Sequence, residues 1–156
     1  MKVIHVDGSC KGNQQKNIKK RRMYTCVVVE ELAKAGKPLN YMGPNDGSQI
    51  NIVLIRGGSN NIAELIAIEN GLKIARGLMY DEVLIKTDSS NNIAWINKDE
   101  IKSKKINDLK LTKKIHRRIK DIWIPQFKKV EFELVPREEN LAGIVLEEES
   151  KKKLLV

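Results

Sequence analysis

The chain has 156 residues, of which 41% are hydrophobic and 31% charged, and this composition is typical of one globular domain spanning residues 1–156. It has no run of about 18 apolar residues, which predicts no membrane contact, and the charged residue at position 7 argues against a secretory signal peptide. The two cysteines, Cys10 and Cys26, are too few for a disulfide framework or a thiolate zinc site, so we expect reduced thiols in a cytoplasmic protein.

The formal net charge of +9 is concentrated in two segments. Residues 98–129 hold twelve Lys and Arg against four Asp and Glu, and residues 11–37 hold eight against two. Segments of this kind favour a polyanionic partner such as nucleic acid, although a lysine-rich surface also serves solubility. Charge alone does not decide between these two interpretations.

The first part of the chain is predicted to contain three strands. Residues 2–7 alternate and are rich in Val and Ile, residues 24–30 form a second β-branched run, and residues 50–56 form a third. The polar segment 11–22 and the segment 33–49, which contains Gly, Pro and Asn, are predicted to be loops. Three consecutive strands favour an antiparallel meander.

Helical periodicity begins after the third strand. Residues 59–79 are apolar over most of the helix circumference, with Ser59 or Asn60 as N-cap, which predicts a central, buried helix. The remaining elements are predicted in the order strand 82–87, helix 89–97, helix 104–122, strand 129–135, and a helix from about 140 to the tail. Strands that are separated by helices favour parallel addition to the same sheet. We therefore expect an α/β fold with a five-stranded mixed sheet, three strands antiparallel and two parallel, and helices on both faces.

Three acidic residues stand at the ends of predicted elements. Asp7 ends the first strand, Asp88 ends the fourth, and Glu64 lies in the first turns of the long helix. Neighbouring strand ends can bring such groups together, and clustered carboxylates suit Mg²⁺ or Mn²⁺. Two such ions about 4 Å apart can activate a water and stabilise a leaving oxygen in phosphodiester cleavage.

Each of these acids also has a structural interpretation. Asp7 precedes Gly8 in a turn signal, Asp88 can cap the helix that follows it, and Glu64 suits the positive end of a helix dipole. Taken one at a time, the acids favour the structural interpretation.

Four motifs in chain order resemble those of type 1 ribonuclease H. The segment DGSCKGN at 7–13 resembles the family opening DGS-x-x-GN, and SNNIAEL at 59–65 resembles T/S-N-N-x-x-E-L. The tripeptide TDS at 87–89 and the segment VPREENLA at 135–142 resemble the motifs at the fourth strand end and before the last helix. Together the motifs cover nearly the whole chain, so the resemblance implies the ribonuclease H-like fold.

The resemblance also implies an activity. It implies an endoribonuclease that hydrolyses the RNA strand of RNA/DNA hybrids as a monomer, with two Mg²⁺ or Mn²⁺ ions and water as the nucleophile. Asp7, Glu64 and Asp88 match the catalytic metal ligands, with Asp7 bridging both ions.

Further matched positions imply contacts with the substrate. Gly12, Asn13 and Asn61 match positions that contact the minor groove and the RNA 2′-hydroxyls, where amides can distinguish RNA from DNA. Ser89 matches a position near the substrate backbone, and capping of the next helix is an equally good interpretation of it.

The basic segment 98–129 falls where some family members carry a protrusion that grips the DNA strand. We therefore expect phosphate contacts from Lys113, Lys114, Arg117 and Arg118.

The remaining aromatic residues of interest are expected to be structural. We expect Trp95 and Trp123 to lie in the core, and we assign structural roles to His5 and His116.

The chain departs from the family pattern in three places. The Gly- and Pro-rich stretch after the first motif is replaced by QQKNIKKRR, and Arg137 stands near the position of the histidine that some members carry before the last helix. Gly143 stands near the family's fourth acid, and Glu147 lies one helical turn later on the same face, where we expect it to act as a fourth ligand.

The missing acid leaves two alternatives open. The chain could be a catalytically weak or silent nucleic-acid-binding module of the same fold, or a related nuclease that acts on DNA.

Overall fold

The structure, a computed structural model, describes residues 1–11, 20–56, 58–98 and 106–152. Its first elements are the strands β1 (Lys2–Lys11) and β2 (Lys20–Val29), the helix α1 (Glu30–Ala35) and the strand β3 (Ser48–Arg56). They are followed by α2 (Asn60–Gly77), β4 (Glu82–Thr87), α3 (Ser90–Lys98) and α4 (Ile106–Arg118). A π-helical turn (Ile119–Trp123) and a 3₁₀ turn (Ile124–Gln126) lead to β5 (Lys129–Leu134), and a second 3₁₀ turn (Arg137–Glu139) leads to α5 (Leu141–Lys151).

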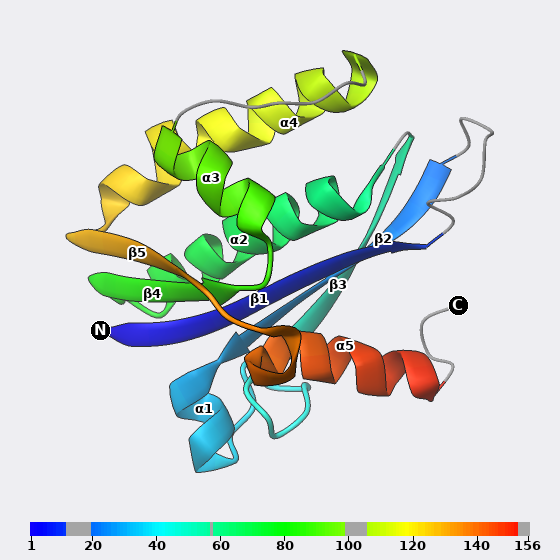
Figure 1. The fold of residues 1–156 in the computed structure, drawn as a ribbon. Helices are drawn as coiled ribbons and strands as arrows, with labels where there is room; N and C mark the ends of the chain where they lie inside the picture. The colour runs from blue at the N-terminus through cyan, green and yellow to red at the C-terminus, as the bar shows by residue number, and fades with distance from the viewer. Residues whose placement is uncertain (12–19, 57, 99–105, 153–156) are drawn as a thin grey trace.

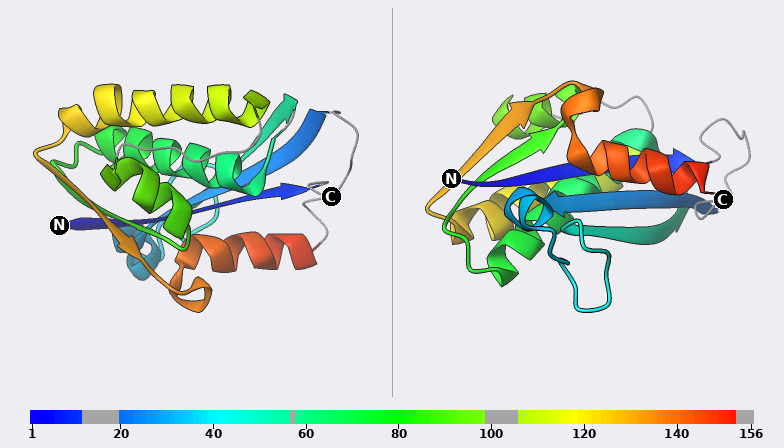
Figure 2. Two further views of the ribbon diagram at one scale, coloured as in Figure 1. Left: turned by 45° about the horizontal axis from the view of Figure 1, so that its top comes forward. Right: turned by 90° about the horizontal axis from the view of Figure 1, so that it is seen from below.

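The five strands form one mixed sheet in the order β3-β2-β1-β4-β5. Strands β1, β2 and β3 pair antiparallel, and β4 and β5 join parallel to β1. Helices α2, α3 and α4 cover one face of the sheet, and α1 and α5 lie on the other (Figures 1 and 2). The predicted fold class, strand directions and two-sided helical cover are confirmed.

Helix α2 is the centre of the core. Its residues Ile62, Leu65 and Ile68 are buried completely, in one cluster with Val6 of β1 and Ile85 of β4. This burial agrees with the prediction of a central helix, and Ser59 is its N-cap because the Ile62 amide donates to the Ser59 hydroxyl at 3.3 Å. No helix among the described residues has the length and apolar character needed to cross a membrane.

Helix α2 lies unusually close to β1 at Gly8. A Cβ atom at this position would overlap the main-chain carbonyl group of Ala63 and the main-chain nitrogen of Glu64. The hydrogen atom of glycine therefore lets the helix backbone rest directly on the strand, one residue after Asp7.

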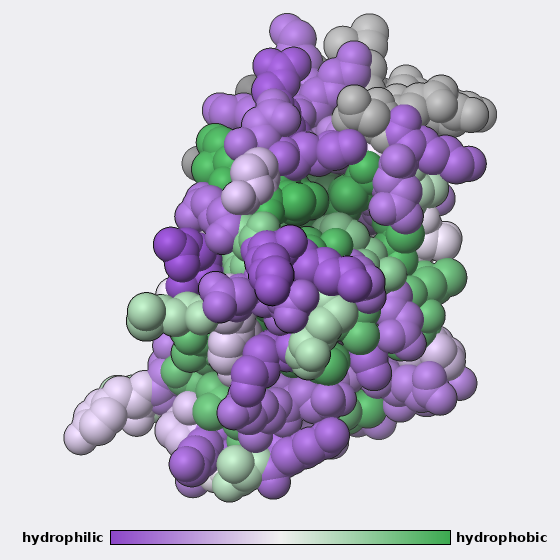
Figure 3. Space-filling model, turned by 90° about the vertical axis from the view of Figure 1, so that its left-hand side faces the viewer, coloured by the Kyte–Doolittle hydropathy of each residue, from purple (hydrophilic) through white to green (hydrophobic). Residues whose placement is uncertain are grey.

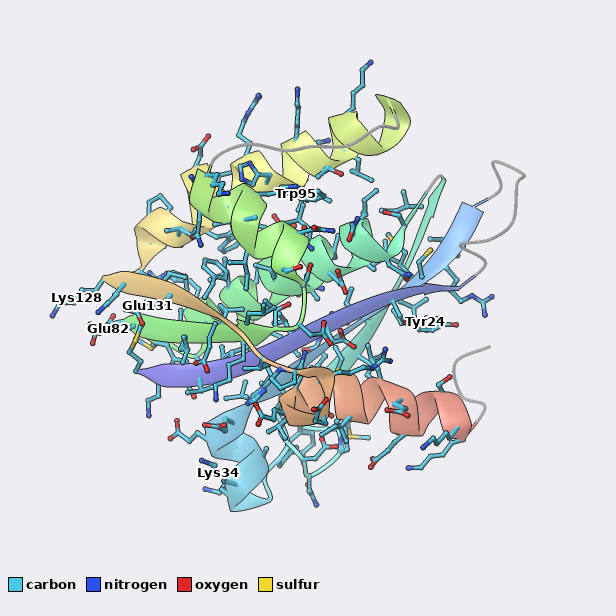
Figure 4. The ribbon with its side chains drawn as sticks, in the orientation of Figure 1. Tyr24, Lys34, Glu82, Trp95, Lys128 and Glu131 are labelled. Carbon is cyan, nitrogen blue, oxygen red and sulfur yellow. The ribbon has the colours of Figure 1, made fainter. Side chains whose placement is uncertain are left out.

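A buried ion pair fixes α4 on α2. The Arg118 guanidinium donates two hydrogen bonds of 2.8 Å to the carboxylate of Glu69, whose side chain is only 3% exposed. His116 of α4 donates through Nε2 to the carbonyl oxygen of Trp95 on α3 at 3.0 Å. Trp95 is buried where α3 faces α4 (Figure 4), and Trp123 packs against the core, as predicted for both.

The structure corrects several predicted boundaries. Strand β1 continues to Lys11, so Asp7 lies within the strand and not at its end as predicted. Strand β2 begins at Lys20. Both strands reach into the segment 11–22 that was predicted to be a loop, because their antiparallel pairing continues to Lys11 and Arg22. The helix α1 was missed, since it has only six residues and buries none of them; Gly36 ends it at φ +64°.

The predicted helix 104–122 differs in its last turn. Its α-helical part ends at Arg118, and a π-helical turn follows. Because a π-helical turn contains more residues than an α-helical one, it rotates the side chains beyond it. Ile122, the last residue of the predicted helix, is half exposed, and Trp123 packs against the core instead.

The close contact at Gly8 predicts a large effect of a single methyl group. Gly8→Ala should lower the free energy of unfolding by about 3 kcal/mol, because the backbones of β1 and α2 must separate. Gly77→Ala is the matched control, since nothing lies within 4 Å of its Cβ position, and it should change stability by less than about 1 kcal/mol. Urea unfolding of both variants measures the difference, and equal effects would contradict the proposed close contact.

Candidate active site

The sheet register brings Asp7 and Asp88 together. Strands β1 and β4 are parallel and pair His5 with Lys86, so two residues further along the same direction Asp7 lies beside Asp88. Glu64 lies near the two aspartates because the contact at Gly8 holds the first turns of α2 on the strand next to Asp7. One oxygen atom from each of the three carboxylates lies within 4.8 Å of the others. The predicted clustering of these acids is therefore present in the structure.

Burial and mutual repulsion both affect the titration of these acids. Burial, together with the charges of Asp88 and Glu64, raises the pKa of Asp7 to about 7. Burial raises the pKa of Glu64 to about 7 as well, against a hydrogen bond from Ser89, and Asp88 adds to the rise. The positive charge of Arg137 acts in the opposite direction on both groups.

These carboxylates fit a divalent cation. Their ligand atoms are all oxygens, which Mg²⁺ and Mn²⁺ prefer, and a cation between them would counteract both the burial and the repulsion that raise the two pKa values. Glu64, Asp88 and Arg137 also line an open cavity of about 590 Å³, with Ser90 and the segment 134–136 completing its wall. The cavity places an arginine next to the acids, which gives the site both an acidic and a basic side.

Helix α5 approaches Asp7 with its backbone and not with an acid. A Cβ atom at Gly143 would lie 3.4 Å from Oδ2 of Asp7, so position 143 faces the cluster but offers no side chain. Glu147 does not join the three acids; it is exposed, and its carboxylate lies 3.6 Å from Nζ of Lys151. The structure therefore does not bring Glu147 together with the three acids, and its role as a fourth ligand stays a prediction.

Two side chains, from Asn140 and His5, hold the start of α5 against β1. Asn140 donates from Nδ2 to the carbonyl oxygen of Val6 at 2.9 Å, and its Oδ1 accepts from the Ala142 amide at 3.1 Å. The Leu141 amide donates to Nδ1 of His5 at 3.3 Å, and the other ring nitrogen of His5 lies 3.2 Å from the Glu30 carboxylate. Burial lowers the pKa of His5, in keeping with a structural role for this residue.

The sequence argument missed the anchoring role of Asn140. An asparagine before the apolar run of α5 is an N-cap signal, so its cap could have been predicted. Its bond to Val6 could not, because the two residues lie 134 positions apart.

The predicted substrate residues lie in different settings. Asn61 is exposed on the first turn of α2, and Ser89 is buried and caps α3, since the Asn92 amide donates to its hydroxyl at 3.4 Å. Gly12 and Asn13 lie outside the described residues. Asn60, considered only as a cap, accepts a hydrogen bond from the Cys10 amide at 2.8 Å and so joins α2 to β1.

The basic residues of α4 form one surface. Lys113, Lys114 and Arg117 are exposed and line a cavity of about 510 Å³ with Lys110 and the bound Arg118. The upper part of the face drawn in Figure 3, where α4 lies, is mostly hydrophilic. Arg118 differs from the others because its guanidinium is already paired with Glu69.

The raised pKa values predict how stability depends on pH. Both acids titrate near 7 in the fold but near 3.8 and 4.5 as free side chains, so between about pH 4 and pH 7 the folded protein holds more protons than the unfolded chain. This contribution to stability is complete below about pH 4 and is lost as the pH rises through 7. In the absence of metal, we expect the melting temperature of the wild type to fall relative to that of Asp7→Asn as the pH rises from 4 to 8.

Added Mg²⁺ provides the second half of this experiment. Because the ligands must be deprotonated, Mg²⁺ should raise the melting temperature of the wild type more at pH 8 than at pH 5.5, and should affect Asp7→Asn much less. Parallel pH profiles for the two proteins, or an equal response to Mg²⁺, would contradict the coupling of the three acids.

Solved structures of ribonucleases H share this fold over nearly the whole chain. RNase H1 from the halophilic archaeon Halobacterium salinarum NRC-1 is 18% identical, with a TM-score of 0.60 over 97% of this chain and 98% of that one. The N-terminal RNase H domain of Rv2228c from Mycobacterium tuberculosis, solved as a fusion with maltose binding protein, is 20% identical, with a TM-score of 0.59 over 97% of each chain. LC11-RNase H1, isolated from compost by a metagenomic approach and solved in complex with an RNA/DNA hybrid, is 19% identical, with a TM-score of 0.56 over 99% of each chain. At these identities the likeness shows the fold.

The sequence comparisons identify the family. No curated protein matches the chain. The profile of the reverse transcriptase-like family matches residues 48–146, which is more than half of the chain and includes Glu64, Asp88 and Gly143. The chain therefore belongs to the reverse transcriptase-like family of ribonuclease H-like proteins.

Proposed function

We propose that the protein is a metal-dependent nuclease that hydrolyses the RNA strand of RNA/DNA hybrids. The observation that carries the proposal is the cluster of Asp7, Glu64 and Asp88, with one oxygen from each within 4.8 Å of the others. The cluster opens on a cavity large enough for part of a nucleic-acid backbone. Support for the substrate comes from the motifs of type 1 ribonuclease H and from the hybrid bound to LC11-RNase H1, which shares the fold.

Each residue of the site has a definite task in this proposal. Two divalent cations, when bound, would supply an activated water and would stabilise the leaving oxygen of the cleaved phosphodiester. Asp7, at the centre of the cluster, would hold both of them, and Glu64 and Asp88 would each complete one side. Arg137, on the wall of the same cavity, would bind a non-bridging phosphate oxygen by charge-assisted hydrogen bonds.

Recognition of RNA would take place at the start of α2. The exposed amide side chain of Asn61 can donate and accept hydrogen bonds, as the 2′-hydroxyl of a ribose also can. Gly12 and Asn13 would contribute to the same selection, as the resemblance implies. A protein that reads the 2′-hydroxyl here would reject a DNA duplex.

A second candidate function has an observation in its favour. Gly143 offers no fourth acid and Glu147 pairs with Lys151, so the cluster has three carboxylates where the family pattern has four. A hybrid-binding module with weak or no catalysis would have the same groove and the same basic helix. Activity against hybrids in Mg²⁺ separates the two functions.

The central experiment compares hydrolysis of a hybrid, a DNA duplex and an RNA duplex. Wild-type protein should cleave only the RNA strand of the hybrid, and Asp7→Asn should lower the rate by roughly 10²–10³-fold, the scale of losing one preorganised electrostatic group. Binding of the hybrid should persist in this variant. Asp81→Asn, an exposed acid outside the cluster, is the matched control and should cleave normally. A wild-type protein that binds the hybrid without cleaving it would establish the second candidate function.

The basic surface of α4 should determine affinity and not chemistry. Replacing Lys113, Lys114 and Arg117 by Gln should raise KM and lower the slope of log affinity against log salt by about 0.9 for each lost phosphate contact, on the scale of B-DNA. Lys34→Gln on α1, on the other side of the sheet (Figure 4), should leave the slope unchanged. An unchanged slope in the triple variant would show that this surface does not touch the substrate.

Arg118 should behave differently from its neighbours on α4. Arg118→Gln leaves the buried carboxylate of Glu69 without its guanidinium and should lower the free energy of unfolding by about 2 kcal/mol. Thermal unfolding of the variant, beside the salt dependence of its binding, separates this structural role from a phosphate contact.

A further inference from the structure

Asn92 is a polar residue in a position that is fully buried. It lies in the first turn of α3 with 0% of its surface exposed. Its Nδ2 donates to the Ser89 hydroxyl at 2.9 Å and to the main-chain carbonyl of Asn61 at 3.2 Å. One side chain thus joins the start of α3 to the start of α2, where the acidic cluster lies.

The oxygen atom of this amide is unusual. Oδ1 of Asn92 has no hydrogen-bond partner in the described part of the chain. Buried polar atoms are nearly always paired, because an unpaired one loses its hydration without compensation. An aliphatic residue of similar width would fill the same space without an unpaired oxygen. The two bonds that Nδ2 makes therefore indicate a role for Asn92 beyond packing.

The bond to Ser89 determines what the Ser89 hydroxyl can do. A serine hydroxyl has one proton to donate and two lone pairs to accept with. The amide Nδ2 and the main-chain N–H of Asn92 both donate to this oxygen, at 2.9 and 3.4 Å, and occupy its acceptor capacity. The proton of Ser89 is then left to donate, and the Ser89 side chain forms a hydrogen bond with the carboxylate of Glu64.

The bond to Asn61 acts on the same helix from another side. The Asn61 carbonyl lies in the first turn of α2, three residues before Glu64. The amide group of Asn92 holds both this carbonyl and the Ser89 hydroxyl. Because the Ser89 side chain contacts Glu64, this arrangement fixes the Glu64 side chain relative to the first turn of α2. A shift of either would stretch one of the two bonds.

We propose that Asn92 is a positioning residue of the acidic cluster, which orients Glu64 for a divalent cation through Ser89 and holds the substrate-facing start of α2 in the same frame. The inference deepens the proposed function, and it rests on that function for the cation. It assigns no contact between Asn92 and substrate or metal. Asn92 acts through its two neighbours.

The test measures Mn²⁺ binding by calorimetry on the protein alone. Asn92→Val removes both bonds and the unpaired oxygen while it fills a similar space. It should weaken Mn²⁺ binding roughly 10-fold, the scale on which residues behind a ligand affect metal affinity, with the melting temperature retained or raised. Asn92→Thr, which has the same shape and can donate one hydrogen bond, should recover part of the affinity.

Two further variants separate positioning from packing. Ser89→Ala should weaken binding like Asn92→Val, and the double variant should be no weaker than Ser89→Ala alone, because Asn92 reaches the cation ligand Glu64 through that hydroxyl and its bond to Asn61 serves the substrate-facing start of α2. Ile96→Val, which loosens the same helix in the core, should lower the melting temperature and leave Mn²⁺ affinity unchanged. If Asn92→Val does not fold, Ser89→Ala and Asn92→Thr carry the same test.

The outcomes distinguish this inference from the proposed function. Unchanged Mn²⁺ affinity in Asn92→Val, or additive losses in the double variant together with a lower melting temperature, would overturn the positioning role, whatever the protein cleaves. A wild-type protein that binds Mn²⁺ but cleaves no hybrid would overturn the proposed function and leave the positioning role standing. A wild type that binds no Mn²⁺ would overturn both.

Discussion

The contact between α2 and β1 at Gly8 is the constraint on which the site depends. Because no side chain separates the two backbones, the helix lies on the strand one residue after Asp7. This closeness brings Glu64 to an acid that lies on another element, and the register of β4 then adds Asp88. Three carboxylates from three elements can stay within 4.8 Å only if the backbones behind them cannot move apart.

The repulsion among the acids is balanced by polar contacts that fix the ends of the surrounding elements. Asparagines make several of these contacts, since an amide can donate to one element and accept from another. Asn60 joins α2 to β1, Asn140 joins α5 to β1, and Asn92 joins α3 to α2. All three bonds lie near the acidic cluster, so they oppose movement of the elements that carry its charges.

The sequence predicted what local pattern and chain direction can determine. Alternation and helical period located all five strands and the central helix, and the parallel direction of β1 and β4 placed Asp7 beside the carboxyl end of β4, where Asp88 lies. The same reasoning failed where a contact between distant residues decides the outcome. Arg118 was predicted to contact phosphate like its neighbours, and its pairing with Glu69, 49 positions away, could not be predicted from local pattern.

Other features lay beyond pattern reasoning for different reasons. The π-helical turn after Arg118 has no periodic signal, because it adds a residue to a single turn of an otherwise regular helix. Asn92 looks like an ordinary polar residue at the start of a helix, and only its complete burial in the fold distinguishes it. The position of Glu147 was predicted correctly on the face of Gly143, but a longer side chain can also turn toward Lys151, one helical turn further on.

Gly143 shows how the fold accommodates one acid fewer at this site. A Cβ atom at this position would lie 3.4 Å from Oδ2 of the Asp7 carboxylate, which is buried, so the backbone of α5 faces the acid without a side chain between them. A fourth carboxylate here would add repulsion to the burial and the neighbouring charges that already raise the pKa of Asp7 to about 7. With three acids and Arg137 beside them, the site carries less negative charge before a cation binds. In the proposed function three acids would hold the cations, so cation binding should depend more strongly on how well these three are oriented. Asn92 and Ser89, which we propose orient Glu64, would then take on part of the task that a fourth acid would perform.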